Sequence, residues 1–533
     1  MKMKKKTNRR DYFFLKKKVF LILLVIGILF TLSAFSNISL YFTSYSQVDL
    51  LEPSSSIATM PQTETITSYY DALLKLPLII SQTAIVGVVF SHLILQRVMH
   101  NRIQPDYGKI DSDMVTRHDA NYYLRPIKRF FVILLSCGIA ILVSATSLFL
   151  LQAISLSSEL GIDVATTFTI LSSTPIGPVW NLRIITSLIV IVCSILYYIL
   201  EKKSVIKKET NEDSISNDVV YPLQTKTRRI STLLPTILLY IIILSGAISI
   251  FSNSMVSHNT ALSFLPSLAI SMDWLHFMAV SVWVGGLFYI SAILLMTIRT
   301  AISKNRNISR SINKLLNDNP VNITSYFLAL LLPYFSLIAT VSLGIIGITG
   351  LYMAWIHLHT AEAIFTSTYG NILAIKLVLA LPMVILGAYH QIKLHGNLVL
   401  VASIKNIKNK QREERNSAAD RDIYSNSSSL VENDPSIKFS KTIKIESLIG
   451  IGVLIAASFL TITSPPSISF QESLSTESSL GEEGQQQDYI PQFDSFTILA
   501  IILAAAVLSG SIIYFKKSKQ QVRNTIAYFE NKI

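Results

Sequence analysis

Long apolar segments recur along this chain at a spacing that predicts membrane-spanning helices. A helix needs about 20 apolar residues to cross the hydrocarbon core of a bilayer, and ten segments reach this length. None alternates apolar with polar positions, as the strands of a membrane β-barrel do. The pattern predicts an all-α integral membrane protein with about ten transmembrane helices, at residues 19–41, 72–97, 129–153, 180–200, 232–252, 271–297, 326–353, 371–392, 445–463 and 496–515.

The positive charges predict how these helices are oriented. All but three of the 46 Lys and Arg residues lie in alternate loops, and the exceptions are Lys75, Arg183 and Lys376. Cytoplasmic loops carry such an excess of cations, so the protein is expected in the cytoplasmic membrane with both termini inside. Residues 1–36 also fit a cleaved signal peptide, although the long apolar core favours a retained helix. Five stretches contain no Lys or Arg: 19–74, 130–182, 230–298, 315–375 and 445–515.

Composition narrows the class of protein further. Of the 533 residues, 50% are hydrophobic and only 15% are charged, whereas soluble domains carry about 25% charged residues. The formal charge of +13 is explained by the cytoplasmic loops, so the expected partner is the lipid bilayer and not nucleic acid. Cys137 and Cys193 both fall inside predicted spans and form no CxxC motif. No phosphate-binding GxxxxGK[ST] loop is present, and we do not expect an enzyme.

An internal repeat divides the spans into two groups of four. Residues 86–90 (VGVVF) resemble residues 284–288 (VGGLF), and the pair Gly177 and Arg183 resembles the pair Gly370 and Lys376. An even number of helices separates the copies, which predicts two parallel four-helix repeats plus flanking helices. The expected units are a basic N-terminus with the first helix and an outer loop (1–71), a first repeat (72–252), a second repeat (253–466), and an acidic loop with the last helix and a basic tail (467–533).

Four of the nine histidines belong to the predicted outer side, and methionines accompany them. Met272 and His276 are four residues apart and would share a helix face. Imidazole suits copper and zinc, whereas a thioether selects soft copper ions. Histidine with methionine and without cysteine therefore favours a copper site on the outer side. The candidate ligands are His258, His276, His357, His359, Met255, Met272 and Met353.

Ionisable side chains near these ligands are candidates for supporting roles. Asp273 would orient His276 or supply countercharge. Arg183 and Lys376 lie early in their spans, where they would anchor to the outer headgroups or pair with Asp273. The repeat aligns Asp273 and His276 with Lys75 and Leu78, so only the second half has the acid and the histidine.

These residues resemble a known family. Asp273-Trp274-Leu275-His276, followed by Trp283-Val284-Gly285-Gly286-Leu287, resembles the DWLH…WVGGL signature of CopD-type copper resistance proteins. The similarity covers roughly 72–466, and its most typical part is about 322–464. Further elements similar to that family are residues 257–259, 368–376 and 173–183, Glu446, and the prolines at 465–466.

The resemblance implies a membrane protein of copper handling that moves copper ions inward, with Trp283 and Lys376 as supporting residues of the signature. Some relatives carry a periplasmic CopC-like copper-binding domain, but no outer segment here is long enough for one. A separate copper donor of CopC type is therefore an expected partner. The alternative function is a haem-binding redox protein with axial histidine pairs, either His92 with His390 or His258 with His276. A sensor or assembly factor without transport stays a third interpretation.

Overall fold

The computed structural model describes five parts of the chain: residues 66–103, 127–258, 266–298, 323–398 and 435–466. Within these ranges the structure does not describe residues 175, 213–222, 359 and 361. It also describes isolated positions between 502 and 524. All regular elements in these parts are helical. The predicted span at 19–41 lies outside the described residues, as does most of the span at 496–515.

Eight helices in the described parts are long and apolar enough to cross a membrane. They correspond to the eight central predicted spans, and this confirms an all-α membrane protein. Several helices continue past their apolar segments into the polar residues that follow. The eight are α2 (Ile66–Ile103), α4 (Ile127–Leu160), α6 (Ile176–Glu212), α7 (Leu223–Ser254), α8 (Pro266–Phe288), α11 (Ile323–Leu358), α13 (Thr368–Tyr389) and α16 (Pro435–Leu460).

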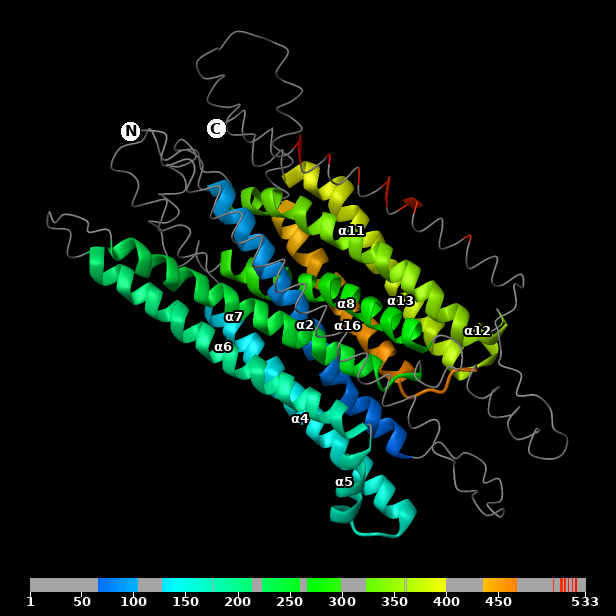
Figure 1. Cartoon of the computed structure of the whole chain (residues 1–533). Coiled ribbons are helices and arrows are strands. Elements are labelled where there is room, and N and C mark those ends of the chain that lie inside the picture. Colours follow the sequence, from blue (N-terminus) through cyan, green and yellow to red (C-terminus); the bar gives the residue numbers. More distant parts are fainter. Residues whose placement is uncertain are drawn as a thin grey trace, which may run out of the picture.

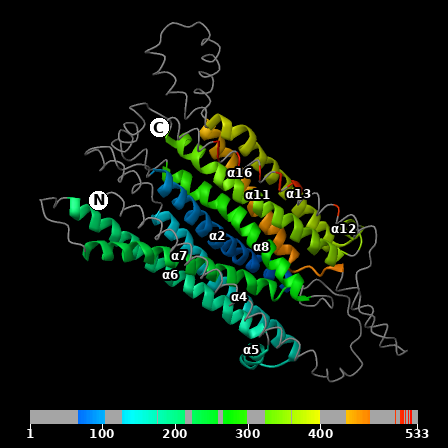
Figure 2. The same cartoon turned by 45° about the horizontal axis from the view of Figure 1, so that its top comes forward.

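Two central helices join two groups of helices, as Figures 1 and 2 show. Helices α2 and α8 pack along each other in the middle of the molecule. Helices α4, α6 and α7 form one group with α2, and α11, α13 and α16 form the other group with α8. This is the arrangement expected if residues 72–252 and 253–466 are two copies of one four-helix unit.

The repeated glycines lie at the point where α2 and α8 cross. A Cβ atom on Gly87 would collide with the carbonyl oxygen of Ser281 and the backbone of Gly285, and one on Gly285 would collide with Thr83 and Gly87. Small residues let membrane helices approach closely enough for backbone contact. Since Gly87 aligns with Gly285 and Thr83 with Ser281, the contact is reciprocal, and this supports the proposed duplication.

The second repeated glycine also has the same role in both halves. A short helix precedes α6 and another precedes α13: α5 (Val164–Ser173) and α12 (Ala363–Thr366), neither of which the apolar pattern predicted. A Cβ atom on Gly177 would overlap the carbonyl of Ser172 at the end of α5. One on Gly370 would overlap the carbonyl of Ala363 in α12. Each glycine therefore lets a long helix start directly against a short one.

Much of the bundle surface is apolar. Helix α13 exposes large hydrophobic side chains along one face, among them Leu377, Val378 and Leu381, which are 60%, 70% and 60% exposed. A soluble protein seldom leaves so large an apolar patch uncovered, but lipid tails cover such a face at no cost. The exposed face therefore agrees with a location in the bilayer.

Candidate functional site

Polar side chains from α7, α8 and α13 gather at one end of the bundle, which we call the His276 end. Asp273 on α8 lies beside the hydroxyl groups of Ser254 and Ser257, where α7 ends. It also interacts electrostatically with Lys376 on α13. Lys376 in turn acts on His276, one helical turn beyond Asp273. The structure thus brings together three of the residues that the sequence singled out.

Thr349 on α11 fixes the imidazole of His276. His276 Nδ1 lies 3.0 Å from Thr349 Oγ1, and the same hydroxyl group donates to the carbonyl oxygen of Ile345 at 2.7 Å. A threonine hydroxyl has one proton, so when Thr349 donates it to Ile345, its oxygen can accept the Nδ1 proton of His276. The other ring nitrogen, Nε2, then carries a lone pair, which is the form of imidazole that binds metal ions.

The neighbouring glycine gives this ring its space. A Cβ atom on Gly350 would stand 3.3 Å from His276 Cε1, which is tighter than ordinary van der Waals contact. Sequence analysis did not identify Thr349 or Gly350 as part of the site. The only local signal was a hydroxyl residue followed by glycine inside an apolar span, and such pairs are common in membrane helices.

His258 lies just past the end of α7, near a different set of neighbours. Its ring forms a hydrogen bond with the backbone of Thr463 and feels the charge of Lys75 on α2. Burial lowers the pKa of His258, Lys75 lowers it further, and the bond to Thr463 opposes both. The Nε2 atom is buried without a hydrogen-bond partner among the described residues. A neutral ring with an unsatisfied nitrogen is suited to bind a cation.

The other two predicted histidine ligands follow α11. His357 in the last turn of α11 is buried, with 2% of its surface exposed. Its ring meets the ring of Tyr369 edge-on, with centroids 5.9 Å apart, and Tyr369 also interacts with Asp273. His357 is thereby linked through Tyr369 to the cluster at the His276 end. His359 lies outside the described residues.

The three predicted methionine ligands are placed differently. Met255 is buried in an apolar cluster with Val179 and Phe251, where it acts as packing. Met272 and Met353 are half-buried. Among the described residues, no three His, Cys, Asp or Glu side chains form a group that could hold a metal ion. His258, His276 and His357 are therefore not assembled into one such group in these parts of the chain.

The supporting residues Arg183 and Trp283 are both engaged in contacts between helices. Arg183 donates hydrogen bonds from Nε and Nη2 to the hydroxyl and carbonyl oxygens of Ser252, at 3.0 and 3.2 Å. Its guanidinium lies 4.3 Å from the ring centre of Trp180, a cation–π contact that stabilises a buried charge. Trp283 is buried in the main hydrophobic core. Arg183 is thus held inside the bundle, with 5% of its surface exposed, and it contacts Ser252 and Trp180, whereas Trp283 takes part in core packing.

Two histidines lie buried toward the opposite end of the bundle, which we call the His390 end. His92 Nδ1 lies 3.0 Å from the hydroxyl of Tyr289, its Nε2 lies 3.3 Å from that of Tyr197, and its ring stacks on Phe130. Both nitrogens of His92 therefore have protein partners. An axial haem ligand needs a free ring nitrogen, so this geometry does not fit the His92–His390 haem pair.

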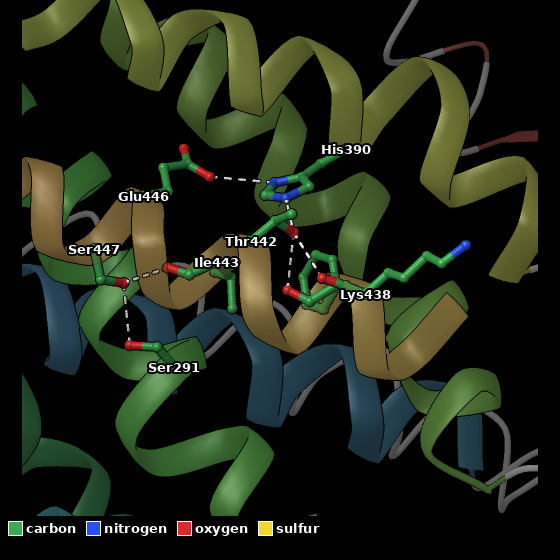
Figure 3. A network of polar contacts seen from close by, with 8 residues as sticks. Ser291, His390, Lys438, Thr442, Ile443, Glu446 and Ser447 are labelled. Carbon is green, nitrogen blue, oxygen red and sulfur yellow. Dashed lines mark hydrogen bonds and ion pairs between the residues drawn. The ribbon is translucent and has the colours of Figure 1, made fainter. Parts of the chain in front are cut away.

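His390 belongs to a polar network that joins α13 to α16 (Figure 3). It opens the π-helical segment η3 (His390–Leu394). Its Nδ1 lies 3.2 Å from Glu446 Oε2, with 5% and 2% of the two side chains exposed. Its Nε2 lies 2.7 Å from the hydroxyl of Thr442. The sequence analysis quoted Glu446 only as part of a family pattern and did not predict this pairing.

Comparison with known proteins supports the family resemblance over one segment, which includes residues 368–376 and Glu446 but not the signature at 273–287. Residues 329–460 match the family model of copper resistance protein D, CopD. No curated protein and no solved structure gave a match. The matched segment contains α13, most of α11 and α16, and therefore Thr349, Lys376, His390 and Glu446. The match confirms the resemblance of this chain to the copper resistance protein D family over residues 329–460.

Proposed function

We propose that this protein moves copper ions inward across the cytoplasmic membrane and captures them at the His276 end. The family match supports copper resistance as the general role. In this proposal the His276 end faces outward, because the loops at that end lack Lys and Arg. A membrane potential that is negative inside would assist entry by about 2.3 kcal/mol per charge and 100 mV.

The orientation of His276 carries the proposal. Its Nδ1 lies 3.0 Å from the hydroxyl of Thr349, which can accept the Nδ1 proton while it donates to Ile345. The ring also interacts with the backbone of Ile346. Metal-binding histidines commonly have one nitrogen fixed by a hydrogen bond and the other directed to the metal. Thr349 would therefore hold His276 in the form that accepts a copper ion.

Charge near His276 would tune this capture. Lys376 balances the charge of Asp273 within the membrane region. An arriving copper ion would take over part of that balancing role, so Asp273 would favour a bound cation and Lys376 would limit its affinity. Moderate affinity suits a carrier, since an ion bound too tightly cannot leave.

The remaining ligands in this proposal are His258, His357 and His359, with assistance from Met272 and Met353. Met255 is left out because apolar side chains surround it. Histidines that do not form one preassembled group would take up an ion in succession or move together around it. A soluble copper donor of CopC type would deliver the ion from outside.

Substitution of His276 tests the proposal. We expect His276→Gln to lower copper binding by the purified protein about 10-fold or more and to reduce copper accumulation in whole cells. Met255→Leu is the matched control, because it alters a nearby packing residue and should leave both measurements within about two-fold. Wild-type accumulation by the His276→Gln protein, present at the wild-type level in the membrane, would contradict the site assignment.

A further inference from the structure

The His390–Glu446 pair has no role in copper capture, yet it lies buried within the membrane-spanning region. Ionisable groups at this depth are costly and are functional candidates by default. Lys438, on the same helix as Glu446, is exposed and points away from the pair (Figure 3). Among the described residues, His390 is the only ion-pair partner of Glu446. The pair therefore has to balance its own charge.

Two ionisable groups lie within ion-pair distance here. His390 Nδ1 and Glu446 Oε2 are 3.2 Å apart, and Oε2 has no hydrogen-bond partner among the described residues. The Thr442 hydroxyl, which lies 2.7 Å from His390 Nε2, can accept a proton from that nitrogen or donate one to it. A neutral imidazole beside the carboxylate leaves one negative charge, and one further proton on either group cancels it.

The pair therefore has two states that differ by this one proton. With it, the pair is neutral overall, whether the proton resides on the imidazole or on the carboxyl group. Without it, a neutral imidazole faces a carboxylate, and the pair carries one buried negative charge. That charge is expensive in an apolar environment unless a cation compensates it.

We propose that His390 and Glu446 form a one-proton exchange site, whose proton leaves to the adjoining aqueous phase when a cation passes through the bundle. The cation replaces the charge of the departing proton, and the proton returns after the cation has left. This inference rests on the proposed copper movement for the identity of the cation. The proton-binding step itself is independent of copper.

The local backbone is suited to such a change. Two π-helical segments, η2 (Tyr289–Leu294) and η3, both contact α16. Ser291 of η2 receives a hydrogen bond from Ser447, the neighbour of Glu446, at 3.1 Å. In η3 the amide of His395 bonds to the carbonyl oxygen of His390. Such π-segments occur frequently at functional sites, and here both hold the same turn of α16.

Other titratable groups near the pair do not form ion pairs with it in the described parts of the chain. The ring of Tyr389 lies 6.2 Å from that of His390. The Tyr289 hydroxyl is engaged by His92. Lys393 on η3 and Lys438 on α16 have exposed side chains. The charge of the pair should therefore be set by its own proton.

Infrared titration of the full-length protein in lipid nanodiscs, without copper, tests the proton-binding step. We expect the wild type to show a titrating buried carboxyl signal that Glu446→Gln lacks, and to take up one more proton per molecule than this variant. Ser447→Ala is the control, because it removes a neighbouring hydrogen bond and no titratable group. If Glu446→Gln does not fold, His390→Gln should cause the same loss. A wild-type titration in either folded variant would overturn the proposal.

Proton movement driven by copper tests the exchange. In vesicles that contain a pH-sensitive dye, we expect copper to move protons through the wild-type protein and about 10-fold fewer through Glu446→Gln, while copper binding stays within two-fold. His276→Gln should lose copper binding and keep the carboxyl signal. A failure of the capture site and a failure of the exchange site therefore give different results. Proton movement at the wild-type level in Glu446→Gln would overturn the exchange.

Discussion

The two halves of the bundle place different charges at corresponding positions. In the first half, Lys75 on α2 interacts with Asp71 on the same helix and, more weakly, with the cation Arg183 on α6. In the second half, the aligned positions are Asp273 on α8 and Lys376 on α13, and they attract each other. The positions that the repeat aligns therefore carry like charges in one half and opposite charges in the other. Only the second half has a carboxylate and a histidine at these aligned positions.

Helix packing differs as well. In the first half α4 packs closely along α6, whereas the corresponding helices α11 and α13 of the second half barely contact each other. Helix α13 relies on α16 instead, and this contact contains the His390–Glu446 pair. The half that contains Asp273, His276 and the His390–Glu446 pair therefore has fewer contacts between its helices.

The largest expected effect comes from the crossing that joins the halves. Gly285→Ala places a methyl group against the backbone of Thr83 and Gly87, where no side chain can move aside. We expect a loss of about 3 kcal/mol or more, measured as a lower melting temperature of the detergent-solubilised protein.

Gly396→Ala is the control for this change. A Cβ atom on Gly396 would meet nothing within 4 Å, so alanine should leave stability unchanged or raise it by up to about 1 kcal/mol. If both variants melted at the same temperature, the two halves would not be joined through backbone contact.

An intermediate effect is expected when the carboxyl groups of the two halves are neutralised separately. Asp273→Asn should weaken copper binding about 10-fold, since it removes the countercharge beside His276. Asp71→Asn removes a carboxyl group near Lys75 in the first half and should leave the affinity within about two-fold. Equal losses in the two variants, measured by equilibrium binding, would remove the distinction between the halves.

The smallest expected effect concerns the pH dependence of copper binding. Lys75 lowers the pKa of His258, so Lys75→Met should raise that pKa. Protons compete with copper for imidazole, and the loss of copper binding on acidification should therefore begin at a higher pH. Lys438→Met removes an exposed cation at the other end and should leave the profile unchanged. A profile unaffected by Lys75→Met would separate His258 from the capture site.

The sequence predicted the helices far better than the contacts between them. Long apolar runs identify spans because lipid requires them, and all eight central spans agree with the structure. The short helix α5 escaped prediction because its start depends on local capping, in which Asp163 accepts a hydrogen bond from the amide of Thr166. Apolar periodicity carries no information about such a cap.

For the candidate site, the sequence could not predict contacts between residues that lie far apart along the chain. Asp273 and His276 could be identified because polar residues are conspicuous in an apolar span. Their partner Thr349 lies 73 residues from His276, and a lone threonine in a span has many ordinary roles. The pairing of His390 with Glu446 was missed for the same reason, since only the packing of α13 on α16 brings the two together.

The crossing of α2 and α8 has a consequence for how the two halves can diverge. Because Gly87 and Gly285 each press against the backbone of the other half, a larger residue in one copy affects both copies at once. The side chains of Lys75 and Asp273 take no part in this backbone contact, although Lys75 also acts on His258 and bonds to the carbonyl oxygen of Thr461 in the second half. One half can therefore acquire charged residues at such positions separately, whereas a larger residue at Gly87 or Gly285 would disturb the packing of both halves.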